Sequence, residues 1–106
     1  MQDLKEGQEE RIRETVIKRI DQYLEERRDI GFMMAVSSSV DNERDHIVNI
    51  GTSILCTKWK VGYPGGSFVQ ALVNNDLMET HGRADDINLN CIRFYVYLMY
   101  NQGYIS

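Results

Sequence analysis

A chain of 106 residues forms one domain around a single modest core. Its formal net charge of −4 leaves no cationic excess of the kind that duplex nucleic acid requires, so we expect no binding to duplex DNA or RNA. The charged N-terminal residues and the lack of an apolar run of roughly 20 residues predict no secretory signal, no membrane span and a cytoplasmic location.

Residues 8–30 carry the clearest helical pattern, and Gly31 is expected to end the helix. Its apolar residues recur at helical spacing and place one narrow stripe along the helix. They are Ile12, Val16, Ile20 and Tyr23. Arg27 and Arg28 are expected in the last turns, where they suit the negative end of the helix dipole. A core this small is not expected to cover so long a stripe, and we therefore predict a homodimer.

Residues 32–45 leave two possibilities open, a short helix or a brief extended piece followed by a loop. Residues 46–60 predict a second helix, capped by Asp41 or Asp45. Gly51 within it indicates the close approach of another helix. The β-branched content leaves a strand possible, although adjacent apolar residues break the alternation that a strand needs.

A corner of chain-breaking residues at 62–67 separates this helix from the next, and Gly62 is expected to end the first of the two. Ser67 is expected to cap a helix that runs to about Thr80 and is closed by Gly82. Asn74 and Asn75 disfavour a helix interior, which suggests that their side chains make backbone or ligand contacts.

The last helix is expected to start at a cap on Asp85 or Asp86 and to end at Asn101. It is apolar almost all round, so we expect neighbours to bury it on several sides. Tyr97, Tyr100 and Tyr104 are expected on one face, either in the core or as an interface or base-stacking stripe. Together these elements predict an all-α fold over residues 1–106. We expect a small irregular bundle with a long N-terminal helix and about three further helices, in which residues 46–101 supply the helical core.

Catalytic chemistry has little support in this sequence. Cys56 and Cys91 lack a CxxC partner pattern, and we expect two buried free thiols, with a disulfide between them as the alternative. No nucleophile motif surrounds the serines that could act with His46 or His81, and residues 79–86 lack a recognised metal-ligand pattern. We therefore predict a non-enzymatic protein with no catalytic residue, no metal and no cofactor.

Three short motifs in residues 59–101 resemble a pattern found in small uncharacterised proteins of bacteriophages and prophages. They are W-x3-YPGGSF with NNDL after it, RADD-x-N, and YLxYN. The resemblance implies a phage or mobile-element origin and carries no catalytic role. It favours a protein partner in the host cytoplasm, such as a host or defence factor that the chain inhibits.

Any binding site is expected where the corner at 62–67 meets the loop at 83–88. The side chains expected to converge there are Tyr63, Ser67, Asn75, Arg83 and Asn88, with Trp59 beside them. The alternative function is a small-ligand or nucleotide-binding module at the same place, because unpaired N–H groups at a helix start attract anions. The Walker and dinucleotide glycine patterns are absent.

Overall fold

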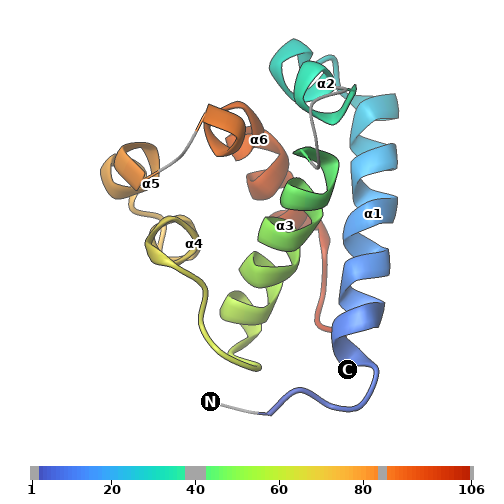
Figure 1. The fold of residues 1–106 in the computed structure, drawn as a ribbon, viewed down its shortest axis with the longest axis vertical. Coiled ribbons are helices and arrows are strands. Elements are labelled where there is room, and N and C mark those ends of the chain that lie inside the picture. Colours follow the sequence, from blue (N-terminus) through green and yellow to red (C-terminus); the bar gives the residue numbers. More distant parts are fainter. Residues whose placement is uncertain (1–2, 38–42, 84–85, 106) are drawn as a thin grey trace.

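The computed structural model describes residues 3–37, 43–83 and 86–105, and within these ranges the chain is all-α with no strand, as predicted. The helices are α1 (Gln8–Glu26), α2 (Ile30–Ser37), α3 (Glu43–Trp59), α4 (Ser67–Val73), α5 (Leu77–Arg83) and α6 (Asp86–Asn101). The expected long helix with about three others is therefore a long helix with five others. α3 lies at the centre and packs against α1, α2, α4 and α6 (Figure 1).

The apolar stripe of α1 lies in the core. Ile12, Val16 and Ile20 are fully buried, and Tyr23 is 4% exposed. α1 runs alongside α3 (Figure 1). A Cβ on Gly51 of α3 would lie 2.8 Å from Val16 Cγ1, which confirms the expected close approach of two helices. Because a single chain covers the stripe, the reason we gave for a homodimer is wrong.

The long N-terminal helix ends earlier than its pattern predicted. α1 stops at Glu26, and Arg27 has an extended backbone, so Arg27 and Arg28 lie beyond the helix. Asp29 starts α2 instead: its Oδ1 accepts a hydrogen bond from the Phe32 N–H at 3.2 Å, as an N-cap residue does. Gly31 lies inside α2 and does not end α1.

The short-helix alternative for the next segment is correct as far as Ser37, and residues 38–42 lie outside the described ranges. Phe32 of α2 is fully buried. Its ring meets Tyr23 of α1 edge-on at 5.0 Å and stacks on Phe94 of α6 at 4.7 Å. This aromatic group joins three helices at one end of the bundle.

The predicted second helix is α3, and the strand alternative is wrong. α3 begins at Glu43, so Asp45 lies inside its first turn and is not the cap; Asp41 is not among the described residues. Its C-terminus is a Schellman motif. Lys60 takes the left-handed conformation (φ 58°), and the Val61 N–H donates to the Cys56 carbonyl at 3.0 Å. Lys60 therefore ends the helical geometry two residues before the glycine that we expected to do so.

The predicted single helix from Ser67 to Thr80 is two helices. Asn75 is left-handed (φ 60°), and the Asp76 N–H donates to the Ala71 carbonyl at 2.9 Å, which closes α4 with a second Schellman motif. Asp76 then caps α5, since its Oδ1 accepts from the Glu79 N–H at 3.1 Å. Asn75 serves through its backbone conformation, which asparagine tolerates better than most residues.

Two further caps differ from expectation. Gly66, not Ser67, is the N-cap of α4, and Ser67 is the first helical residue with no side-chain capping bond. Gly82 lies inside α5, which continues to Arg83. The proposed cap Asp85 lies outside the described residues, and α6 starts at Asp86.

α6 ends at Asn101 as predicted, and the C-terminal segment then runs back along the bundle to the start of α1 (Figure 1). Two polar contacts fix this path. Arg19 Nη2 donates to the Asn101 carbonyl at 2.7 Å, and the buried Gln8 side chain donates to the Ile105 carbonyl at 2.8 Å. Within the described ranges we find no helix with both the length and the apolar character that a bilayer span needs.

Candidate functional site

One row of apolar side chains on α6 is only partly covered by the rest of the described chain. Ile92, Val96 and Tyr100 are spaced four residues apart and therefore share one face of the helix. Val96 is 36% exposed and Tyr100 is 82% exposed, while Ile92 is half-buried. We call these three residues the α6 ridge. α6 is buried on several sides as expected, against α1, α2 and α3, and the ridge is the face that stays partly exposed.

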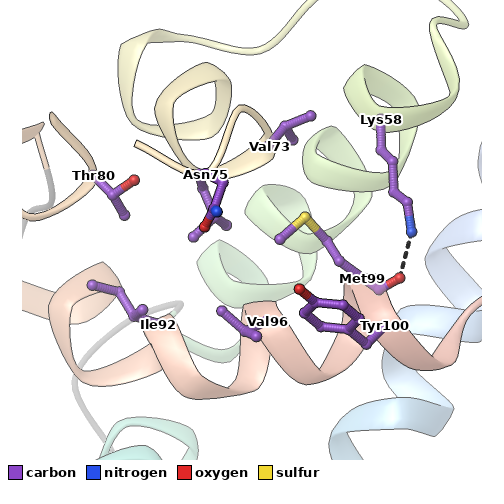
Figure 2. A pocket seen from close by; sticks show the side chains of 9 residues that line it. Lys58, Val73, Asn75, Thr80, Ile92, Val96, Met99 and Tyr100 are labelled. Atoms are coloured by element: carbon purple, nitrogen blue, oxygen red, sulfur yellow. Dashed lines mark hydrogen bonds between the residues drawn. The ribbon is translucent and has the colours of Figure 1, made fainter. Parts of the chain in front are cut away.

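A cavity of about 410 Å³ lies on one side of the ridge, between α6 and the α4–α5 segment (Figure 2). We call it the α4–α6 pocket. The ridge residues form one wall, and the others are Lys58, Leu72, Val73, Asn75, Thr80 and Met99. In Figure 2 the side chains of α6 lie opposite Val73 and Asn75. The lining is mainly apolar, as in most ligand and peptide sites.

The break between α4 and α5 shapes this pocket. The left-handed backbone of Asn75 turns the chain, so that Val73 and Thr80 line the same cavity from two helices. The Thr80 hydroxyl donates to the Asp76 carbonyl at 2.6 Å, which satisfies a polar group that is 1% exposed. A continuous helix from 67 to 80 would have carried the chain straight past this position.

A second cavity of about 410 Å³ lies on the other side of the ridge and faces the end of α1. We call it the α1–α6 pocket. Besides the ridge residues it is lined by Tyr23, Arg27, Arg93, Tyr97 and Asn101. The Arg27 guanidinium lies 5.8 Å from the centre of the Tyr97 ring, which is within cation–π range. The early end of α1 therefore supplies an arginine to this pocket.

Cations border the ridge on both sides. The charged residues that line the two pockets are Lys58, Arg27 and Arg93, and no carboxylate lines either pocket among the described residues. Lys58 Nζ also donates to the Met99 carbonyl near the end of α6 (Figure 2). The chain as a whole carries −4, so this cationic surface is local.

Glu26 lies beside the α1–α6 pocket without lining it. Hydrogen bonds from Gln22 and from the Tyr97 hydroxyl lower the pKa of Glu26, with Arg27 and Arg19 adding to the effect. Burial raises the pKa of Tyr97, and its hydrogen bond to Glu26 at 3.1 Å raises it further. Glu26 is therefore ionised and already engaged by donors of its own chain.

The residues predicted to form a binding site lie in separate surroundings. Tyr63 is 94% exposed and lines a different cavity from Asn75, which lines the α4–α6 pocket. Arg83 Nε binds Glu79 Oε2 at 3.2 Å within α5. Asn88 is 4% exposed, and its Oδ1 accepts from the Tyr95 hydroxyl at 2.9 Å in the interior.

The corner at 62–67 is closely packed. A Cβ on Gly65 would meet Ser53 Oγ at 2.5 Å and Val69 Cγ1 at 2.6 Å. The Gly65 N–H donates to Thr57 Oγ1 at 2.9 Å, so this N–H is not presented to a ligand. The predicted neighbour Trp59 is half-buried and packs edge-on against Tyr104 at 5.4 Å.

The tyrosine stripe of the last helix does not form one face. Tyr97 is 8% exposed and packs against Tyr23, whereas Tyr100 is on the surface, and Tyr104 lies beyond the end of α6. Tyr100 alone of these three belongs to the ridge. The ridge has no distinct signal in the sequence, because α6 is apolar almost all round and its pattern does not mark the face that packing leaves open.

Cys56 and Cys91 are buried thiols that do not form a disulfide, as predicted. Burial raises the pKa of Cys56, with Glu9 adding to the effect, and this disfavours the reactive thiolate. Among the residues that the structure describes, no group of three His, Cys, Asp or Glu side chains is placed to hold a metal ion.

Comparison with protein-family models, curated proteins and solved structures finds no match to this chain. The similarity of residues 59–101 to phage proteins therefore remains a sequence resemblance alone.

Proposed function

We propose that this protein is a non-enzymatic binding protein that acts through contact between the α6 ridge and a partner protein. The observation that carries the proposal is a partly exposed apolar row of three residues, bordered by two cavities of about 410 Å³ each. Apolar surface that is contiguous and hollowed is typical of interaction sites, whereas single exposed apolar residues are ordinary.

The composition of this surface supports the same function. Tyrosine, methionine and arginine are enriched at the cores of protein interfaces, and lysine and carboxylates are depleted there. The ridge and pockets present Tyr100, Met99, Arg27 and Arg93, with one lysine. Tyr100, which is 82% exposed, is the natural anchor residue.

The phage resemblance suggests what the partner is. We propose a host or defence factor in the host cytoplasm, whose activity the chain blocks by occupying one of its surfaces. A homodimer would need a surface other than the α1 stripe, which is covered, for example the ridge or the exposed side chains of α2. These include Ile30 and Met34, which are 66% and 69% exposed.

A nucleotide-binding function at the corner has less support. α4 has seven residues, and the Gly65 N–H before it already has a partner within the chain. Arg83, one of the residues expected at that site, is paired with Glu79. A panel of nucleotides should therefore leave the melting temperature of the protein unchanged.

Two exposed tyrosines provide the test of protein binding. Tyr100 and Tyr63 are 82% and 94% exposed, so Tyr100→Ala and Tyr63→Ala should each leave the melting temperature almost unchanged. We expect tagged wild type and Tyr63→Ala to capture the same partner from cells that contain it, and Tyr100→Ala to lose most of it. Equal capture by the two variants would contradict the proposal.

A further inference from the structure

The charges beside the α6 ridge indicate which partner chemistry suits it. Lys58 lines the α4–α6 pocket, and Arg27 and Arg93 line the α1–α6 pocket, so cations border the apolar row on both sides. A partner complementary to this pattern has an apolar row with carboxylates on each side of it. Its carboxylates would also be attracted before contact, which raises the association rate.

The shape of the surface favours a helix as the partner element. The ridge follows α6, a helix of 16 residues, and a second helix can lay its side chains into the hollows beside such a row. An extended peptide usually adds to the open edge of a sheet, and the described chain contains no strand to extend. Helix-in-groove recognition uses apolar anchors at positions i, i+4 and i+7.

The three cations can reach such a partner. Arg27 and Arg93 are exposed side chains. Lys58 is also exposed. Its ammonium group donates one hydrogen bond to the Met99 carbonyl and has further protons to donate to a partner. Arginine additionally offers paired N–H donors that match a carboxylate.

Resting on the function proposed above, we propose that the α6 ridge binds an acidic amphipathic helix of the partner protein. Apolar side chains of that helix occupy the α4–α6 and α1–α6 pockets. Its flanking carboxylates pair with Lys58 on one side and with Arg27 and Arg93 on the other. Single-stranded nucleic acid is the less suitable anion, because the ridge itself exposes one aromatic ring, Tyr100, and otherwise aliphatic side chains.

Stapled helical peptides test this inference without the natural partner. The first peptide carries leucines at i, i+4 and i+7 with glutamates on both sides. The second has lysine in place of every glutamate, and the third has serine in place of every leucine. Fluorescence anisotropy at low ionic strength should give the first peptide a Kd about tenfold lower than either of the others. Amide shifts in NMR spectra should map its contact to α6.

Charge reversal on the protein supplies the matched control. Arg93→Glu should weaken the binding of the glutamate peptide about three- to tenfold and strengthen the binding of the lysine peptide. Lys18→Glu makes the same charge change on α1, where Lys18 is exposed and lines neither pocket, and should leave both affinities unchanged. Loss of folding cannot explain a gain in affinity for the lysine peptide in the Arg93→Glu variant.

Three outcomes would overturn the inference. Equal binding of the glutamate and lysine peptides at α6 would refute the acidic chemistry and leave protein binding in place. If no helical peptide binds while partner capture still depends on Tyr100, the claim that the partner element is a helix is refuted, and the proposed function is not. Tighter binding of a single-stranded oligonucleotide than of the glutamate peptide at α6 would identify nucleic acid as the occupant. Loss of the Tyr100 dependence itself would instead contradict the proposed function.

Discussion

The Tyr23 hydroxyl donates a hydrogen bond to Asp29 Oδ2 at 2.7 Å, while the other oxygen of the same carboxylate accepts from the Phe32 N–H. One side chain therefore binds the last turns of α1 and caps the start of α2. This arrangement directs Phe32 into the core, where it meets Tyr23 and Phe94. It also leaves Arg27 extended beside the α1–α6 pocket.

Replacing Asp29 should destabilise the fold. Asp29→Ala removes the cap of α2 and the acceptor of the Tyr23 hydroxyl, and we expect the free energy of unfolding to fall by about 1–3 kcal/mol. Asp29→Asn is the matched control, because asparagine caps helices nearly as well and keeps an acceptor oxygen. Urea unfolding followed by circular dichroism measures both variants, and equal losses would contradict the capping role.

Alkaline pH should destabilise the protein through Tyr23. Burial raises the pKa of Tyr23 well above its ordinary value of 10.0, and the hydrogen bond to Asp29 raises it further. The contribution of protonated Tyr23 to the free energy of unfolding is complete below pH 10. It is lost above this pH, because the unfolded chain then releases the tyrosine proton while the native protein retains it. Tyr23→Phe should therefore show a smaller decline in unfolding free energy from pH 9 to about pH 11.5. An unchanged decline would exclude Tyr23 as its source.

Two helical glycines should respond oppositely to alanine. Gly51→Ala places a Cβ 2.8 Å from Val16 Cγ1 and 3.3 Å from Leu98 Cδ2, so we expect a loss of about 1–2 kcal/mol from overpacking. Gly82→Ala meets no atom within 4 Å and should gain about 0.5–1 kcal/mol from helix propensity. Thermal unfolding measures the stability of both variants. A stabilised Gly51→Ala protein would show that α1 and α3 are not in close contact.

The turn between α4 and α5 should depend on the backbone of Asn75. Asn75→Val puts a β-branched residue at a φ of 60° and should cost about 1–2 kcal/mol, whereas Asn75→Gly should be close to neutral. Asn74 has a φ of −83°, so Asn74→Ala is expected to have little effect. A tolerated Asn75→Val substitution, measured by chemical unfolding, would contradict this account of the break.

Regular apolar spacing was sufficient to predict the main helices. Residues close together in the chain were enough to predict three features. These are the stripe from Ile12 to Tyr23, the helix α3 and the end of α6 at Asn101. The breaks at 27–29 and 74–76 were missed although local signals exist. Asp76 followed by Glu79 is typical of a helix start, and Asn75 before it tolerates the left-handed conformation.

The side chains expected to converge at one site lie in different surroundings for another reason. Tyr63, Ser67, Arg83 and Asn88 are polar or aromatic residues near predicted turns, but proximity depends on how the helices pack. The split between α4 and α5 and the close packing of Gly65 put these side chains in different surroundings. The two pockets combine the α6 ridge with walls from α1, α3, α4 and α5, and no local pattern contains that information.

The sequence by itself determined that the chain is helical, with buried thiols and a buried stripe on its first helix, because helical periodicity and residue burial are set by side chains a few positions apart. The tertiary structure alone decided which face of α6 remains open and which cations border it. Those properties arise from segments far apart in the chain, such as those that hold Tyr23 and Asn101, whose contacts form only when the helices pack together.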